Sequence, residues 1–270
     1  MNLRDRVVVV TGAGSGIGRA TALAFANEGA RVAACDVDEA RLESLAVELG
    51  DRKLLVRRVD VSDRLSMKLF ADAVHELAPA ADIVVNNAGV AVGGPFLETT
   101  LDDWDWLLGV NLRGVVHGCH YFIPKMVTRG SGGNVFNVSS ILGIYPAPNV
   151  TAYVASKFAV RGFSQSLRAE LAPHRIGVTA ICPGMIATAI VADGRMSGKI
   201  GSRRAKMVET FKERGAPPSK VAEAILDAVR TNPAVRPVGA DAMVIAALTR
   251  VAPRAFNRLA GTLQRRFGAG

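Results

Sequence analysis

Short apolar runs alternate with longer segments of helical periodicity, and this alternation limits the fold of the chain more than any other feature. The apolar runs are "RVVVVTG", "RVAACD", "KLLVRRVDV", "DIVVNNAG", "GNVFNVSS" and "RIGVTAICPG", and the sequence predicts helices between them over 16–28, 39–49, 64–77, 101–128 and 152–172. Repeated strand–helix–strand units of this kind build parallel sheets that helices cover on both faces. We therefore expect an α/β fold with one doubly wound parallel sheet flanked by helices.

The same alternation argues for a single domain, because no linker rich in proline or serine interrupts it. We assign residues 1–240 to this domain and residues 241–270 to a C-terminal extension. The regular pattern stops after Pro183, and residues 185–216 combine small apolar residues with glycines, lysines and arginines. Two interpretations of this segment remain open: a lid over a cleft, and a surface helical hairpin.

The net charge of the 270 residues is +9, which by itself would suit nucleic acid or an anionic surface as a partner. Residues 242–270 hold five arginines and no acidic residue, so they supply +5 of this charge. The rest of the chain is only mildly basic, and we expect no nucleic-acid binding. Residues 252–267 predict a basic amphipathic helix, which could lie on an anionic membrane surface or pack within an oligomer; its apolar stripe is Phe256, Leu259, Leu263 and Phe267.

The sequence predicts a cytoplasmic protein, with peripheral membrane contact only through 252–267. Its first apolar run is too short for a signal-peptide core, and no apolar stretch of about 18 residues occurs. The cysteines lack CxxC spacing, which favours buried thiols over disulfides or metal ligands; they are Cys35, Cys119 and Cys182. The histidines show no metal-ligand spacing, so we expect no metal; they are His75, His117, His120 and His174.

The stretch "TGAGSGIG" at residues 11–18 joins the first predicted strand to the first predicted helix. In this position Gly12 would permit a tight turn, and Gly16 would let a pyrophosphate approach the backbone. Gly18 would let the helix pack closely on the sheet. The N-terminus of the helix would add free N–H donors and a positive dipole. The sequence therefore predicts a dinucleotide site at this turn.

Asp36 ends the second predicted strand, 18 residues after Gly18. There its carboxylate would accept hydrogen bonds from both hydroxyls of an adenosine ribose, and it would repel a 2′-phosphate. Neither Ser15 nor Val37 is a lysine or arginine that could offset this repulsion. The pattern therefore predicts NAD as the cofactor in preference to NADP.

Seven motifs in series resemble the classical short-chain dehydrogenase/reductases. They span about residues 4–190 and comprise Thr11 to Gly18, Asp60 with Val61, Asn86 to Gly89, Asn111, Ser140, Tyr153 with Lys157, and Pro183 with Gly184. Each motif alone is weak evidence, whereas their order along one chain is specific. The resemblance implies a single-domain Rossmann-type fold, a nicotinamide cofactor, an alcohol or carbonyl substrate, and a homodimer or homotetramer.

The resemblance also implies cofactor contacts residue by residue. Asp60 would bond the adenine amino group, the backbone of Val61 would lie beside the ring, and the turn 87–89 would pass under the ribose. Ile186 and Thr188 would hold the nicotinamide carboxamide. The full set implied is Gly12, Ser15, Gly16, Ile17, Gly18, Asp36, Asp60, Val61, Asn87, Ala88, Gly89, Tyr153, Lys157, Pro183, Gly184, Ile186 and Thr188.

Tyr153 and Lys157 stand four residues apart, so on a helix their side chains share one face. Alcohol oxidation needs a base, and a tyrosine with a pKa of ~10 becomes one near neutral pH only if its phenolate is stabilised by roughly 4 kcal/mol. The Lys157 ammonium and a positive nicotinamide ring would act in that direction. By the resemblance, Ser140 rather than Ser139 would donate to the substrate oxygen, and the backbone carbonyl of Asn111 would hold a water that links Lys157 to solvent.

The loops expected to line the substrate pocket are mostly apolar, which favours a hydrophobic substrate; they are "VAVGGPF", "ILGIYPAPN" and "MIATAIVADGRMSGKI". We predict an NAD-dependent oxidoreductase that interconverts a secondary alcohol and a ketone, or a primary alcohol and an aldehyde. Two alternatives remain open. One is a reductase of a ketone held on an acyl thioester or carrier, and the other is a non-catalytic NAD(H)-binding regulator on the same fold.

Overall fold

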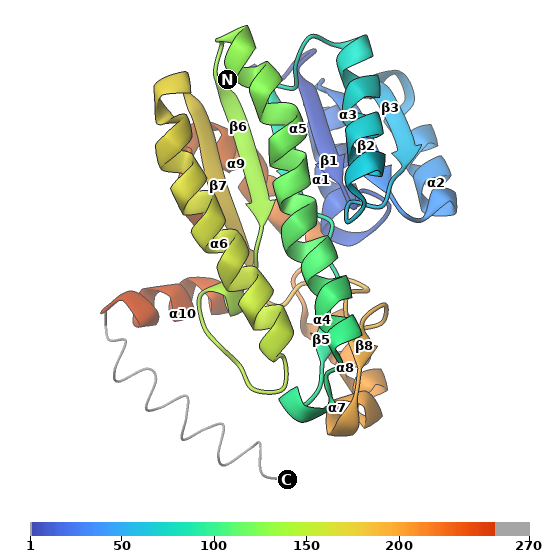
Figure 1. Cartoon of the computed structure of the whole chain (residues 1–270), viewed down its shortest axis with the longest axis vertical. Helices are drawn as coiled ribbons and strands as arrows, with labels where there is room; N and C mark the ends of the chain where they lie inside the picture. The colour runs from blue at the N-terminus through green and yellow to red at the C-terminus, as the bar shows by residue number, and fades with distance from the viewer. Residues whose placement is uncertain (1, 252–270) are drawn as a thin grey trace.

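A computed structural model of the chain describes residues 2–251 (Figure 1). The amphipathic helix predicted for 252–267 lies outside these residues. Within them, α10 (Ala240–Val251) begins at the predicted boundary of the extension and packs beside β9 (Val235–Val238). The division into a domain and a separate extension stays a prediction.

Seven strands form one sheet, and every neighbouring pair is parallel. The order across the sheet is β3-β2-β1-β4-β6-β7-β9. The strands besides β9 are β1 (Val7–Thr11), β2 (Arg31–Asp36), β3 (Lys53–Arg58), β4 (Ile83–Asn86), β6 (Gly133–Val138) and β7 (Ile176–Pro183). The six apolar runs of the sequence thus become six strands of a doubly wound sheet, which confirms the predicted fold class, whereas β9 was not predicted.

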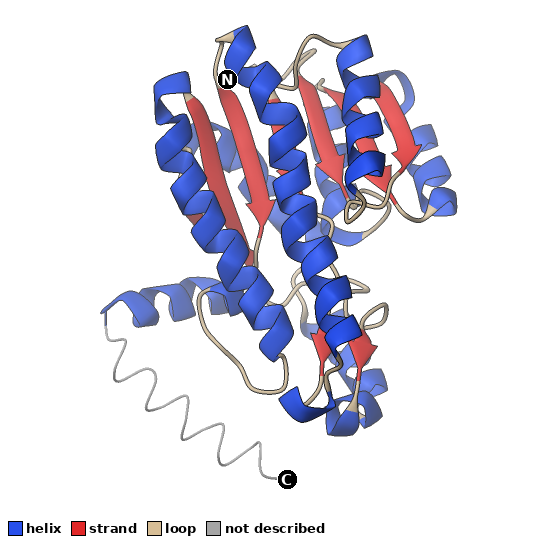
Figure 2. Ribbon diagram, viewed as in Figure 1, coloured by secondary structure: helices blue, strands red, loops and turns tan. Residues whose placement is uncertain are grey.

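Helices cover both faces of this sheet (Figure 1, Figure 2). One face packs against α1 (Gly16–Asn27), α2 (Glu39–Leu49) and α9 (Pro218–Thr231), and the other against α3 (Arg64–Leu77), α5 (Gly114–Arg129) and α6 (Thr151–Leu171). In β1, Val8 and Val10 enter the first core while Val7 and Val9 enter the second. Alternate side chains of a strand point to opposite faces, so a strand covered on both faces has to be apolar throughout.

The remaining elements lie mostly at the carboxyl ends of the strands, at the lower end of Figure 1. The helices are α4 (Leu101–Leu108), α7 (Gly198–Ser202) and α8 (Arg204–Arg214), and a second small sheet pairs β5 (Val92–Gly93) with β8 (Arg195–Met196). Short 3₁₀ turns are η1 (Gly50–Arg52), η2 (Phe96–Glu98), η4 (Ile141–Gly143) and η5 (Ala172–His174), and a π-helical turn is η3 (Gly109–Arg113).

β1 and β4 are neighbours in the sheet although β2 and β3 separate them in the sequence. The strand order reverses at this pair, and ligands of such sheets bind in the crevice beyond the carboxyl ends at the reversal. Thr11 ends β1, and its Oγ1 accepts hydrogen bonds from the backbone N–H groups of Asn87 (3.0 Å) and Ala88 (3.2 Å), just beyond β4. The fold therefore brings "TGAGSGIG" and "NNAG" together at the crevice.

The single helix predicted over 101–128 is divided by the π-helical turn η3. Within it, the side chain of Asn111 accepts from the backbone N–H of Val90 (2.8 Å) and donates to the Val90 carbonyl (3.0 Å). Single π turns inside helices occur frequently at functional sites.

Residues 185–216 contain regular structure, namely β8, α7 and α8, where the sequence suggested an irregular segment. Good helix formers dominate α8, "RAKMVETFKER", which explains its local conformation. The two ends of the segment meet, since the Ala187 N–H donates to the Ala216 carbonyl and the Ala216 N–H donates to the Met185 carbonyl, both at 2.9 Å. Residues 185–216 are thus partly helical, and their movement as a lid stays a prediction.

The three cysteines are free, buried thiols, as the sequence predicted. Burial raises the pKa of Cys182 to about 11 and that of Cys119 to about 12. It raises the pKa of Cys35 still further, with the charge of Asp36 acting in the same direction. The folded protein therefore keeps thiol protons that the unfolded chain releases above about pH 9.

We expect the free energy of unfolding to fall as the pH rises above about 9, and Cys35→Ala to reduce this fall. Below the unfolded pKa the thiol contributes its full stability, which is then lost toward its raised folded pKa at about 1.4 kcal/mol per pH unit. Urea unfolding of both proteins between about pH 7 and 11 measures the difference in slope. Parallel curves across the whole range would contradict this assignment of the Cys35 proton.

Candidate functional site

Two glycines of the glycine-rich turn adopt a backbone conformation that residues with a side chain rarely adopt. Gly12 and Gly16 have φ values of +65° and +50°, a region that favours glycine. A Cβ at Gly16 would lie 3.0 Å from Cγ2 of Thr188, so the segment after β7 lies against this turn. Gly16 is also the first residue of α1, whose early N–H groups are free to bind an anion.

The side chain of Asn87 holds the turn in place. Its Nδ2 donates to the carbonyls of Thr11 and Gly12, each at 3.0 Å. At Gly18 a Cβ would overlap the Gly12 carbonyl oxygen and the Asn87 side-chain nitrogen. Gly18 is therefore closely packed, but against the turn and the Asn87 side chain, where the sequence predicted packing on the sheet.

Asp36 lies beside the turn at the end of β2. Its Oδ2 accepts from the backbone N–H of Gly14 (2.9 Å), and its Oδ1 accepts from the N–H of Asp38 (3.1 Å). The carboxylate is thus oriented by two backbone donors, and each oxygen keeps a lone pair for a ribose hydroxyl. This geometry supports the predicted contact between the Asp36 carboxylate and the hydroxyls of an adenosine ribose.

Asp60 and Val61, which were predicted to contact the adenine, follow β3, the strand next to β2 at the edge of the sheet. Asp60 is exposed and accepts from the backbone N–H and hydroxyl of Ser62, at 2.9 and 2.7 Å. Val61 is buried, and its carbonyl lies 2.9 Å from Nδ1 of His117. His117, interpreted from the sequence as a packing residue, therefore anchors the backbone that would border the adenine.

Tyr153 and Lys157 project from the same face of α6, as their spacing predicted. The ammonium Nζ of Lys157 lies 5.6 Å from the centre of the Tyr153 ring and donates to the Val138 carbonyl (3.0 Å). A Cβ at Gly89 would lie 3.4 Å from the same Nζ, so glycine keeps this side of the lysine open. Tyr153 shares a hydrogen bond with Ser140. Three segments distant in sequence, around residues 89, 138–140 and 153–157, thus converge on one point.

The two neighbouring serines have different surroundings. Ser139 donates from its hydroxyl to the Lys157 carbonyl (2.7 Å) and is buried against α6. Ser140 accepts from the Leu142 N–H (3.1 Å) and also bonds Tyr153. The hydroxyl of Ser140 therefore faces the tyrosine, whereas that of Ser139 holds a helix in place. This arrangement supports the choice of Ser140 over Ser139.

Burial dominates the protonation of the tyrosine and the lysine. It raises the pKa of Tyr153 to about 12, against the opposing effect of the Ser140 hydrogen bond, and lowers the pKa of Lys157 to about 8. The sequence argument expected Lys157 and a positive nicotinamide ring together to lower the pKa of Tyr153; in the protein without a nicotinamide, the pKa is raised. The cause is that desolvation of the phenolate outweighs these neighbours. An acidic tyrosine therefore needs a further cation beside it.

Asn111 lies beneath this group. Besides its two bonds to Val90, its side chain donates to the hydroxyl of Ser156 (3.1 Å), which itself donates to the Tyr153 carbonyl (2.7 Å). The amide thereby ties η3 to the first turn of α6. The proposed role of its backbone carbonyl stays a prediction.

Residues 183–188 continue from β7 to the other side of the crevice. Pro183 ends β7, the Gly184 N–H donates to the Val238 carbonyl (2.8 Å), and Ile186 is buried beside Ala216. The Met185 N–H donates to Oδ2 of Asp241 (2.9 Å), in the first turn of α10. No sequence pattern pointed to a contact between Asp241 and this segment, because only the fold brings residue 241 beside residue 185.

The three loops expected to line a substrate pocket lie together. β5 of the first pairs with β8 of the third, and the Gly94 N–H donates to the Asn149 carbonyl (2.7 Å) of the second. Trp106 packs in one apolar cluster with Tyr153, and the Arg195 guanidinium lies 4.1 Å from the Trp106 ring centre. The sequence interpretation did not foresee that Trp106 shares a cluster with the tyrosine or that Arg195 stacks on Trp106.

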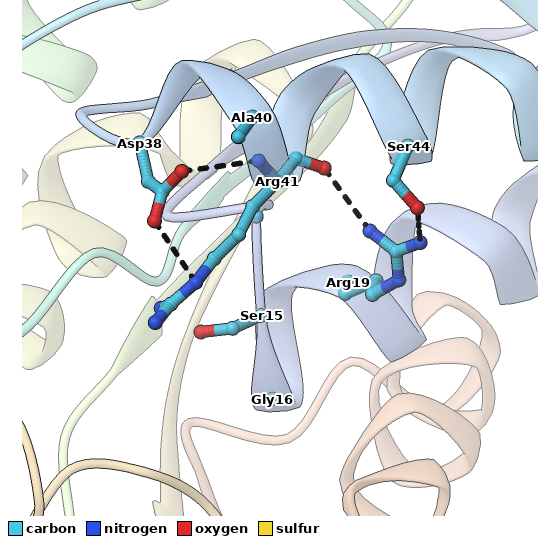
Figure 3. A pocket seen from close by; sticks show the side chains of 8 residues that line it. Ser15, Gly16, Arg19, Asp38, Ala40, Arg41 and Ser44 are labelled. Atoms are coloured by element: carbon cyan, nitrogen blue, oxygen red, sulfur yellow. Dashed lines mark hydrogen bonds and ion pairs between the residues drawn. The ribbon is translucent and has the colours of Figure 1, made fainter.

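A second hollow lies on the outer side of the glycine-rich turn, between α1 and α2 (Figure 3). It is lined by Gly14, Ser15, Gly16, Arg19, Asp38, Ala40, Arg41 and Ser44. Arg19 and Arg41 were not among the predicted site residues. Both lie on helices, and no sequence pattern distinguishes an arginine of a binding site from any other arginine on a helix surface.

Taken together, the doubly wound sheet, the glycine-rich turn and the Ser140, Tyr153 and Lys157 group define a Rossmann-type α/β protein of the nucleotide-dependent oxidoreductase class. The sequence matches the short chain dehydrogenase family over residues 6–197. The chain therefore belongs to the short-chain dehydrogenase family.

Relatives and solved structures agree with this assignment. The chain is 44% identical over 264 residues to the probable oxidoreductase EphD of Mycobacterium tuberculosis, covering 95% of this chain but 45% of EphD, so it spans about half the length of that relative. It is 35% identical over 265 residues to the putative oxidoreductase SadH of the same organism, with 96% and 95% covered. A short-chain dehydrogenase/reductase from Burkholderia phymatum in complex with NAD superposes with a TM-score of 0.87 at 27% identity, covering 93% and 94%.

Among residues 2–251, no helix is long and apolar enough to span a bilayer. In the same range no group of three or more His, Cys, Asp or Glu side chains could hold a metal ion. The cytoplasmic location, the homodimer or homotetramer and the membrane contact through 252–267 stay predictions.

Proposed function

We propose that this chain is an NAD-dependent dehydrogenase that interconverts a hydrophobic secondary alcohol and its ketone. The observation that carries the proposal is the Tyr153 hydroxyl bonded to Ser140, with the Lys157 ammonium 5.6 Å from the centre of the tyrosine ring and close to Gly89. The apolar character of the loops around β5 and β8 supports a hydrophobic substrate. A purely regulatory binder has no need of all three polar groups.

The residues at the crevice fit a dinucleotide. Gly12 and Gly16 leave backbone exposed at positive φ, α1 begins at the turn, and the Asp36 carboxylate is oriented beside it. Gly12 to Gly18 would hold the pyrophosphate, and Asp36 the adenosine ribose. When bound, the nicotinamide would accept or donate the hydride and place its positive ring near the tyrosine. The complex of the Burkholderia phymatum relative with NAD supports this choice of cofactor.

Tyr153 and Ser140 would orient the substrate oxygen between them. In oxidation Tyr153 would take the hydroxyl proton at its phenol oxygen, and in reduction it would return one. Ser140 would donate to the oxygen as negative charge develops. Lys157, whose lowered pKa of about 8 lets it exchange a proton near neutral pH, would relay protons from Tyr153. Because burial raises the pKa of Tyr153, oxidation should accelerate as the pH rises above neutral.

The test is a substrate panel with the purified chain. Secondary alcohols of increasing apolar size are supplied with NAD⁺ or NADP⁺, and the absorbance of the reduced cofactor is followed. We expect turnover with NAD⁺ that improves with the apolar size of the alcohol. Tight binding of NADH, without turnover of any alcohol or ketone in the panel, would favour the regulator instead.

A further inference from the structure

Arg41 is a cation that the fold brings to the adenosine side of the turn. A Cβ at Gly14 would lie 2.9 Å from Cγ of Asp36 and 3.1 Å from Cβ of Arg41, so the stems of both side chains border the same glycine. In Figure 3 the Arg41 guanidinium extends from α2 toward the turn, and Ser15 lines the same hollow. The sequence argument for NAD considered only Ser15 and Val37, and it missed this guanidinium.

Two carboxylates already pair with this guanidinium. Nε of Arg41 lies 3.0 Å from Oδ2 of Asp38, and Nη1 lies 3.5 Å from Oδ2 of Asp193. Asp193 belongs to the segment between Gly184 and Ala216, which is far from α2 in the sequence. Two carboxylates therefore pair with the guanidinium, and the carboxylate of Asp36 lies near the stem of the same arginine.

The other arginines nearby are engaged elsewhere. Arg19 donates to the Arg41 carbonyl (3.2 Å) and the Ser44 hydroxyl (2.9 Å), and it pairs with Glu48. Arg58 donates to the Val37 carbonyl (3.1 Å) and does not line the hollow. Arg41 is thus the guanidinium best placed to meet a group on the adenosine ribose.

We propose that Arg41 decides how the site treats a 2′-phosphate, and that Asp38 and Asp193 hold its charge so that a free 2′-hydroxyl is preferred. A phosphate monoester carries about two negative charges and pairs well with a guanidinium. With Arg41 neutralised, a 2′-phosphate meets three carboxylates and no available cation. Because Asp193 lies in the segment after Gly184, that segment takes part in cofactor choice. The inference rests on the proposed dinucleotide site.

The test compares the dissociation constants of NAD⁺ and NADP⁺ by titration calorimetry on the full chain. Asp193→Asn should lower the ratio of the NADP⁺ to the NAD⁺ constant by about twofold to fivefold, the range expected for exposed ion pairs. Asp38→Asn, which keeps a side chain able to cap α2, should lower it further in combination. Adding Arg41→Gln to that double variant should erase the gain.

Two controls separate this effect from its alternatives. Asp103→Asn breaks the ion pair with Arg195 (3.1 Å), which ties the same segment to α4, and Arg58→Gln removes a nearby exposed charge. Both should leave the ratio unchanged. An unchanged ratio in the double variant, or an equal shift in either control, would overturn the proposal while the NAD⁺ site stands. Failure of the unmodified chain to bind either cofactor would reject the proposed function, and this inference with it.

Discussion

Tyr153→Phe should lower the rate of alcohol oxidation by at least about 10³-fold, within the range that general acid–base groups contribute. The change removes one oxygen, the atom that shares a hydrogen bond with Ser140 and would exchange the substrate proton. The ring remains, so the apolar cluster with Trp106 and the position of Lys157 beside the ring should persist. The affinity for NAD⁺ should therefore change little. Steady-state rates and cofactor titration on the same preparation measure both quantities.

Tyr121→Phe is a matched control for this variant. Tyr121 lies half-buried on α5, where its ring packs against His117 and His120. Turnover of this variant should stay within about twofold of the unmodified protein, since Tyr121 is not part of the Ser140, Tyr153 and Lys157 group. If Tyr153→Phe retained full turnover, the assignment of the acid–base group would be wrong whatever the control showed.

Gly18→Ala should destabilise the protein by about 3 kcal/mol and abolish cofactor binding. The new Cβ would overlap the Gly12 carbonyl oxygen and would lie 2.8 Å from the Gly12 carbonyl carbon. Overpacking against backbone typically costs about 1–3 kcal/mol, and here it also displaces the Asn87 side chain that holds the turn. Urea unfolding gives the stability, and titration with NAD⁺ gives the binding.

Gly162→Ala is the matched control, and we expect it to change the stability in the opposite direction. Gly162 is exposed within α6, and a Cβ there would have no neighbour within 4 Å. Alanine in a helix interior is favoured over glycine by about 0.5–1 kcal/mol, so this variant should be slightly more stable and bind NAD⁺ normally. Equal losses in both variants would show that general glycine content, and not the contact with Gly12, sets the effect.

The strands and most helices were predictable because their signals are local. β1 is apolar at every position since both faces are covered, and α2 and α3 span the predicted residues, 39–49 and 64–77. The spacing of Tyr153 and Lys157 likewise needs only helical geometry. The π turn around Asn111 escaped prediction because it arises from bonds to the backbone of Val90, a contact across 21 residues.

By itself, the sequence determined the class of sheet and the family, since each depends on periodicity or on motifs read in order, and it predicted the residues of the crevice. Only the tertiary structure decided how those residues are charged and held. Desolvation raises the pKa of Tyr153 in the protein without a nicotinamide. The fold also placed Arg41 between Asp38 and Asp193, which lie 155 positions apart in the sequence. Burial and long-range pairing depend on which elements meet in space, and no local pattern carries that information.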